Sequence, residues 1–280
     1  MRKALHFPCS VIDESLDQIK GGDVVNLIAP SSTGKSGAVF RYLCRRYGFY
    51  MTCSSINERT TTIYTNDHLT QALQNQLRSE STQTEIYLWG DHYAALAILS
   101  RLCTLSVRLS QRDSLPPPEE FLQWQCSGLT NPMADLFRVL VELEYHKVSL
   151  ELLYSLIGQA TDNVAKLLSV EEPLPFFIDE AQVFSGKRCL NGMMVVTAQK
   201  TIRPNAILSL LIRSVLEMRS KTPEEKDWDS PVIIYGTGFS TPQLELIQSS
   251  IFNNSDRKFL KCGSASTLRR SSGRSRLGDG

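Results

Sequence analysis

One segment constrains the fold of this chain more than any other: a strand, a glycine-containing loop and an amphipathic helix follow one another between residues 24 and 47. The run VVNLIA, from Val24 to Ala29, is rich in apolar and β-branched residues, which is typical of a strand buried on both faces. From Gly37 to Tyr47 apolar residues recur at helical spacing, and Gly48 is placed to cap that helix. A second short strand, FYMTCS, follows. This order predicts a parallel sheet with the helix as its crossover.

The rest of the chain predicts a helical block between two parts of that sheet. Helical periodicity is long at Tyr93–Leu109 and Ala134–Leu156, and the prolines at 116–118 interrupt it. Strand patterns return at residues 173–179 and 232–238, with a helix expected at 205–218. From Cys262 onward Gly, Ser and Arg dominate, which predicts disorder. We therefore divide the chain into a first core segment (1–67), a helical insertion (68–170), a second core segment (171–260) and a disordered basic tail (261–280).

Composition limits the class of protein. With 280 residues, of which 42% are hydrophobic, the chain can bury a real core. Its net charge of +1 predicts no general attraction to nucleic acid or to an anionic membrane. Seven cysteines without a CxxC pair favour a reduced, intracellular protein, cytoplasmic or nuclear. Pro8, Asp13 and Glu14 make the apolar stretch after the basic start too short for a signal peptide, and no apolar run is long enough to span a bilayer, so we expect no membrane association.

Residues 29–36, APSSTGKS, match the phosphate-loop pattern GxxxxGK[ST] with Ala29 in place of the first glycine. Such a loop turns backbone N–H groups inward, and together with the helix N-terminus they hold nucleotide phosphates. Lys35 would neutralise the β- and γ-phosphates, and the Ser36 hydroxyl would be a Mg²⁺ ligand. A chance GKS in a turn is the alternative. The residues expected to bind nucleotide are Ser31, Ser32, Thr33, Gly34, Lys35, Ser36 and Gly37.

The segment PFFIDEAQ supplies the acids that phosphate-loop enzymes need at the end of a buried strand. We expect Asp179 to hold Mg²⁺ through water, and Glu180 to act as the general base toward the attacking water. An acidic cap after an edge strand is the alternative. Thr237, at the end of the strand at 232–238, or else Ser240 just after it, would contact the γ-phosphate; alternatively Thr237 is a turn residue. The expected catalytic residues are Glu180, Lys35 and Thr237.

Together, VVNLIAPSSTGKS, FFIDEAQ and VIIYGTG resemble the Walker A, Walker B and sensor 1 segments of additional-strand P-loop ATPases, the class that includes AAA+ and STAND proteins. The chain is most similar to the NTPase module of the Crinkler-type proteins of fungi and oomycetes. The resemblance implies an α/β parallel-sheet P-loop NTPase core with strand order 5-1-4-3-2, a large helical insertion, and ATP and Mg²⁺ as cofactors. Ala29 and Ser32 depart from the glycines common in the family. The low-complexity ending would fit a truncated product without the family's helical lid.

The expected function is Mg-dependent binding and hydrolysis of ATP, and other functions stay open. A superfamily 1 helicase would need a second RecA-like domain. A kinase would need an Arg-rich lid, and a GTPase would need an NKxD motif. For the kinase, Arg41, Arg45 and Arg46 fit better as a solvated helix face. The main alternative is a nucleotide-switched scaffold or effector with little catalysis, whose helical block binds an unknown protein partner.

Two further partners would involve the basic end of the chain: a second copy of the chain and nucleic acid. Arg257 is either an arginine finger in a homo-oligomer or an ordinary surface residue. Residues 257–280 carry seven Lys or Arg against one Asp, which leaves the rest of the chain mildly acidic. Binding of nucleic acid by this tail has no support beyond that charge.

Overall fold

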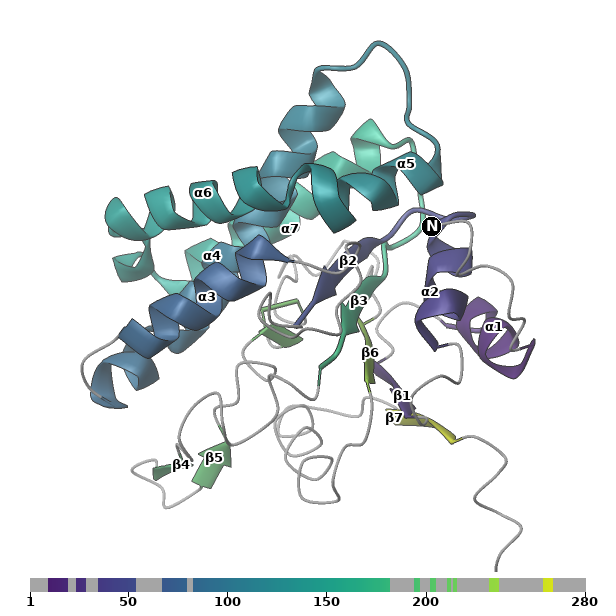
Figure 1. Ribbon diagram of the computed structural model, residues 1–280. Coiled ribbons are helices and arrows are strands. Elements are labelled where there is room, and N and C mark those ends of the chain that lie inside the picture. Colours follow the sequence, from purple (N-terminus) through teal and green to yellow (C-terminus); the bar gives the residue numbers. More distant parts are fainter. Residues whose placement is uncertain are drawn as a thin grey trace, which may run out of the picture.

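The structure is a computed structural model in which most described residues are helical and five strands form a parallel sheet (Figure 1). The residues that it describes are 10–19, 24–28, 35–53, 67–79, 83–181, 194–196, 202–204, 211–212, 214–215, 232–236 and 259–263.

The sheet consists of β1 (Val24–Ile28), β2 (Phe49–Thr52), β3 (Phe176–Asp179), β6 (Val232–Gly236) and β7 (Phe259–Gly263). They lie in the order β2-β3-β6-β1-β7, and every neighbouring pair is parallel. Counted one to five along the chain and read from β7, the order is 5-1-4-3-2. The strand that precedes the GKS tripeptide is therefore separated from the strand that ends in Asp179 by β6 alone. A separate antiparallel pair is formed by β4 (Met194–Val196) and β5 (Ile202–Pro204).

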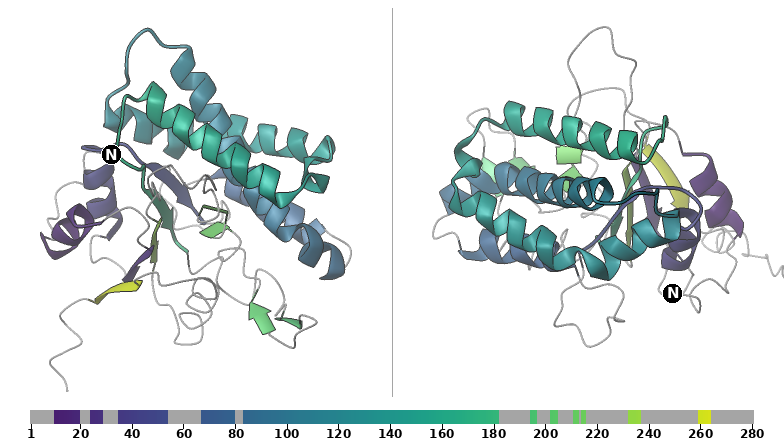
Figure 2. Two further views of the ribbon diagram at one scale, coloured as in Figure 1. Left: turned by 180° about the vertical axis from the view of Figure 1, so that it is seen from behind. Right: turned by 90° about the horizontal axis from the view of Figure 1, so that it is seen from above.

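Helices cover both faces of this sheet. On one side lie α1 (Ser10–Asp17) and α2 (Lys35–Leu43), and on the other the helical block, as Figure 2 shows from behind and from above. The block contains the α-helices α3 (His68–Ser79), α4 (Gln83–Ser110), α5 (Pro118–Gln123), α6 (Thr130–Glu142) and α7 (Leu150–Leu167), with a π-helical turn η2 (Trp124–Gly128) and a 3₁₀ turn η3 (Tyr145–Lys147).

Alternation along the strands explains this layering. Phe49, Met51 and Ile178 are buried against the helical block, whereas Tyr50 and Phe177 are buried on the opposite face with α2. Because successive strand side chains point to opposite faces, an uninterrupted apolar strand needs cover on both. The continuous apolar runs of β2 and β3 thus require the two helical layers.

The centre of the block is α4, which packs against α3, α6 and α7. By length and composition alone its segment Trp89–Ser110 could cross a membrane, yet most of that segment is buried in the protein. It also carries Arg101, whose side chain is fully buried and ion-paired with Asp67. We therefore describe α4 as the core helix of the block.

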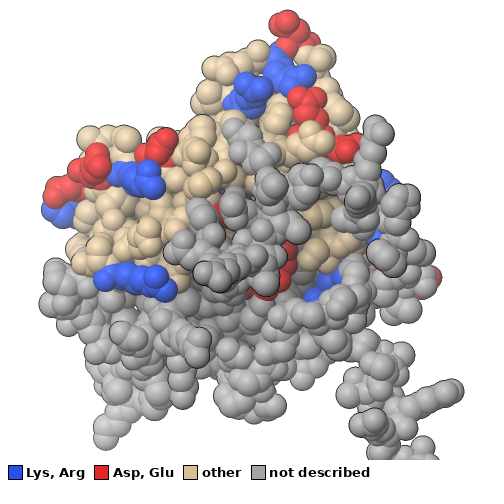
Figure 3. All heavy atoms as spheres, in the orientation of Figure 1, with Lys and Arg blue, Asp and Glu red and all other residues tan. Residues whose placement is uncertain are grey.

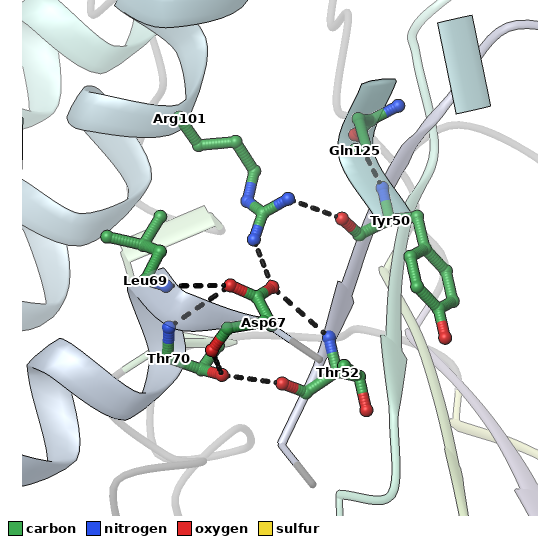
Figure 4. A network of polar contacts seen from close by, with 7 residues as sticks. All are labelled: Tyr50, Thr52, Asp67, Leu69, Thr70, Arg101 and Gln125. Atoms are coloured by element: carbon green, nitrogen blue, oxygen red, sulfur yellow. Dashed lines mark hydrogen bonds and ion pairs between the residues drawn. The ribbon is translucent and has the colours of Figure 1, made fainter. Parts of the chain in front are cut away.

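The outer edge of β2 is paired with side chains of the block instead of another strand. The Tyr50 N–H donates to Gln125 Oε1 at 2.9 Å, and the Tyr50 carbonyl accepts from Arg101 Nη1 at 2.6 Å (Figure 4). Gln125 Nε2 donates to the Gly48 carbonyl at 3.0 Å. These bonds satisfy backbone groups that an edge strand would otherwise present to solvent or to another chain.

The same edge continues at Thr52, where the N-terminus of α3 meets the strand. Asp67 accepts from the N–H groups of Leu69 and Thr70 at 3.0 and 3.2 Å, so it is the N-cap of α3. Its other oxygen accepts from the Thr52 N–H at 3.4 Å and from Arg101. The Thr70 hydroxyl donates to the Thr52 carbonyl at 2.7 Å. One buried network, the edge network of Asp67, Thr70, Arg101 and Gln125, therefore joins the block to the sheet.

Three expectations about local structure are wrong. Helix α2 ends at Leu43, and Gly48 lies beyond it, where a methyl group would lie 2.8 Å from Leu43 Cδ2 and 3.0 Å from Pro175 Cγ. The glycine therefore allows a close approach and does not cap the helix. The stretch 134–156 is not one helix, because Glu144 adopts a left-handed φ of 61° between α6 and η3. The tail does not begin at residue 261, because β7 continues to Gly263 in register with β1.

Candidate active site

The candidate site lies at the carboxyl ends of β1, β3 and β6. Ile28, the last residue of β1, is in register with Gly236, the last residue of β6. Ile178 pairs with Ile234, so β3 ends at the same level of the sheet. The carboxyl ends of these three strands therefore lie at one edge of the sheet, which is where open parallel sheets bind ligands.

Lys35 is the first residue of α2, and it reaches this edge as a buried side chain that is only 6% exposed. Burial lowers the pKa of its ammonium group from the usual 10.5, and the negative charges of Glu180 and Asp179 partly oppose that shift. The three side chains therefore lie within electrostatic range of one another. The structure thus brings together three of the residues that the sequence singled out, and their roles stay predictions.

Asp179 is held in position through several of its atoms. Its side chain is buried, with Oδ1 accepting the Glu180 N–H at 2.7 Å and Oδ2 accepting the Tyr50 hydroxyl at 3.0 Å. Its carbonyl accepts the Cys53 N–H at 2.9 Å, which extends the pairing of β2 with β3. A carboxylate bound through both oxygens has a defined plane, as a ligand for a cation or its water must have.

Glu180 begins the turn away from the sheet. Its φ of 51° lies in the left-handed region, which costs a residue with a side chain about 1–2 kcal/mol. Its side chain is half-buried, unlike that of Asp179. The turn thus sends two adjacent acids into different environments, one enclosed and one at the rim of the site. Strained backbone of this kind is common at functional sites.

The remaining predicted residues are only partly described. Ser36 and Gly37 follow Lys35 in the first turn of α2, and both are half-buried. Residues 31–34 of the phosphate loop lie outside the described residues, as do Thr237, Ser240 and Arg257. Their predicted roles stay predictions.

The donor atoms at the site suit Mg²⁺ better than a metal ion whose ligands must all come from the protein. Within the described ranges no group of three or more His, Cys, Asp and Glu could hold a metal ion. Mg²⁺ keeps several waters and binds through one or two carboxylates and substrate phosphates, so it needs no such group. By formal charge, one ammonium and two carboxylates leave the site at −1, and a divalent cation would reverse that sign. Asp179 and Ser36 are the residues that would hold it.

Of the three arginines that the sequence assigned to a solvated helix face, Arg45 and Arg46 are exposed as expected and lie just beyond α2, whereas Arg41 is not. Arg41 is largely buried and binds both carboxylate oxygens of Asp13 on α1, at 3.1 and 2.8 Å. Arg45 and Arg46 are more exposed, with longer contacts of 3.9 and 3.8 Å to Asp17. These ion pairs attach α1 to α2, and they give Arg41 a structural partner.

Sequence reasoning missed Tyr50, the hydroxyl donor to Asp179. Its ring is buried against Phe40 of α2, with centroids 5.3 Å apart, on the sheet face that α2 covers. A signal was present: Tyr50 is the one residue of the apolar run FYM with a hydroxyl, and a buried tyrosine hydroxyl needs a partner.

Comparison of the chain with known protein families, with curated proteins and with solved structures found no match. Functional assignment therefore depends on the motifs in the sequence and on the geometry of Lys35, Asp179 and Glu180.

Proposed function

We propose that this chain binds Mg·ATP and hydrolyses it, as a P-loop ATPase module of the additional-strand class similar to that of Crinkler-type proteins. One observation carries the proposal: Lys35, the lysine of the GKS tripeptide, shares the carboxyl edge of a parallel sheet with Asp179 and Glu180. The strand order 5-1-4-3-2, which the resemblance implies for this class, supports it further.

Each described residue has a role in this proposal. Lys35, at the N-terminus of α2, neutralises charge on the β- and γ-phosphates, where the helix dipole also favours an anion. Ser36 and Asp179 hold Mg²⁺, which when bound spreads and neutralises the negative charge of the phosphates. Glu180, at the rim, orients and deprotonates the attacking water. Thr237 is assigned beside the γ-phosphate, and residues 31–34 are assigned the backbone cradle.

A second candidate is a nucleotide-switched scaffold, for which the surface of the helical block is the specific observation. Leu143 and Leu152 are 64% and 51% exposed at the corner where α6 passes into α7. Charged side chains of both signs are interspersed over the described part of the face in Figure 3, so a partner there would meet no single-sign patch. Tight ATP binding with negligible turnover would favour this candidate over an ATPase.

The test is nucleotide binding by the purified chain and its Lys35→Ala variant. We expect the variant to bind Mg·ATP at least tenfold more weakly, a loss of about 1.4 kcal/mol, because it lacks the cation at the phosphates. Lys166→Ala is the matched control, because Lys166 is an exposed lysine of α7 in the helical block. GTP is measured in parallel. Equal ATP binding by wild type and Lys35→Ala would show that the loop is not a phosphate site.

A further inference from the structure

Tyr50 connects the helical block with the candidate metal ligand. Its hydroxyl donates to Asp179 Oδ2 at 3.0 Å across the β2–β3 pair, and the whole residue is only 1% exposed. Asp179 and Thr52 are paired in the same ladder, so Tyr50 lies two residues earlier on the neighbouring strand, on the α2 side of the sheet.

The position of Tyr50 is fixed from three directions. Gln125 and Arg101 bind its backbone N–H and carbonyl from the helical block, as Figure 4 shows. Phe40 of α2 packs against its ring. A phenol has few rotatable bonds, so fixing the backbone and the ring also fixes where the hydroxyl points.

From this geometry we infer that Tyr50 is a positioning residue for Asp179 and sets the Mg²⁺ affinity of the site. This inference rests on the proposed function. The Glu180 N–H holds one oxygen of the carboxylate and the Tyr50 hydroxyl holds the other. Two donors on different oxygens define the plane of the carboxylate, and therefore the direction in which it can offer electron pairs to a metal-bound water. Without the hydroxyl, Oδ2 of the carboxylate loses this anchor, while the Glu180 N–H still holds Oδ1, so the carboxylate is less firmly oriented.

The test is the Tyr50→Phe variant, which keeps the ring and removes the hydroxyl. Tyr42→Phe is the matched control, because Tyr42 is also buried in the same core, packs against Phe177, and lies beside the Arg46 guanidinium instead of Asp179. Binding of a fluorescent ATP analogue is titrated with Mg²⁺, and Mn²⁺ binding is followed by electron paramagnetic resonance.

For Tyr50→Phe we expect the metal concentration at half-saturation to rise about tenfold, as for other partners that orient a metal ligand. Binding of the analogue in EDTA should stay at the wild-type level, and Tyr42→Phe should match wild type throughout. In the Asp179→Asn background, Tyr50→Phe should cause no additional rise, because it acts through that carboxylate.

The outcomes separate this inference from the proposed function. If the wild-type chain does not bind the analogue, the proposed function fails and the inference fails with it. If wild type binds with Mg²⁺ dependence but Tyr50→Phe and Tyr42→Phe have the same half-saturation, only the role of Tyr50 is refuted. An equal rise in the Asp179→Asn background would also refute it, because Tyr50 would then act elsewhere.

Discussion

Replacing Arg101 by methionine tests whether the edge network holds the helical block to the sheet. Arg101 is fully buried, its Nη2 is paired with Asp67, and its Nη1 donates to the Tyr50 carbonyl. Methionine fills a similar volume without charge, so the change removes the guanidinium and leaves the Asp67 carboxylate buried without its cation. The perturbation is therefore electrostatic more than steric.

The magnitude follows from what is left unpaired. Removing one partner of a buried ion pair typically costs about 3–5 kcal/mol, because the remaining charge is uncompensated. The Tyr50 carbonyl also loses a buried donor, which alone costs about 1–3 kcal/mol and is part of the same total. With whole-protein stability of about 5–15 kcal/mol, Arg101→Met should remove roughly a fifth or more of it.

The assay is urea unfolding followed by far-ultraviolet circular dichroism, with Arg138→Met as the matched control. Arg138 is also in an ion pair on a helix of the block, but it and Asp135 are 59% and 68% exposed. Such a pair contributes about 0.5 kcal/mol or less. The double variant Asp67→Asn, Arg101→Met also removes the uncompensated Asp67 carboxylate. It should therefore be more stable than Arg101→Met by about 2 kcal/mol. If Arg101→Met loses no more stability than Arg138→Met, the network does not join the block to the sheet.

Two further predictions concern Glu180 and Cys126. Glu180→Gln should leave ATP bound but abolish turnover, measured as phosphate release, because only the base is lost; release at the wild-type rate would exclude Glu180 from the mechanism. Burial raises the pKa of the Cys126 thiol from 9.0 to about 12. Below pH 9 this thiol is neutral in both the folded and the unfolded chain. Between pH 9 and 12 it ionises only in the unfolded chain. Its contribution to the free energy of unfolding should then fall by up to about 1.4 kcal/mol per pH unit. Cys126→Ser should flatten that fall in urea unfolding at a series of pH values, and identical slopes for both proteins would contradict the reasoning.

The sheet could be largely predicted from sequence, because four of its strands are short runs in which apolar residues dominate. Strands β1, β2, β3 and β6 occur where the pattern predicted them. The fifth, β7, was missed because FLKCG mixes apolar and basic residues at the head of a basic tail, and its strand conformation comes from pairing with β1. Local sequence carries little information about such a partner, more than two hundred residues away.

The break between α6 and α7 shows another limit of pattern reading. Apolar residues continue at helical spacing through Leu143 and Val148, and neither Gly nor Pro marks the turn. The chain instead turns at Glu144, which has a left-handed backbone conformation. No sequence pattern indicates that conformation. Ser149 then caps α7 by accepting the Leu152 N–H at 3.3 Å.

For the candidate site, the strand-end motifs predicted which charges would meet, and the structure brings Lys35 within range of Asp179 and Glu180. The side chains that surround these three charged groups could not be predicted. Tyr50 reaches Asp179 only because β2 and β3 pair in one particular register, although 129 residues separate the two side chains in the chain. Contacts of this kind depend on tertiary packing, which residue types and spacing do not encode locally.

The pairing of the strands also sets an order in which the molecule can be completed during synthesis. The side-chain partners of β2, from Asp67 to Gln125, all leave the ribosome before β3, so its outer edge can be occupied before its inner one. Strand β1, in contrast, is made first and gains its neighbours last, because β6 and β7 are the last strands of the sheet to be synthesised. The strand before the GKS tripeptide can therefore pair with its neighbours only after residues 232–263 have been made. A nascent chain can shape its helical block early, but it can assemble the candidate site only after the end of the sheet has been translated.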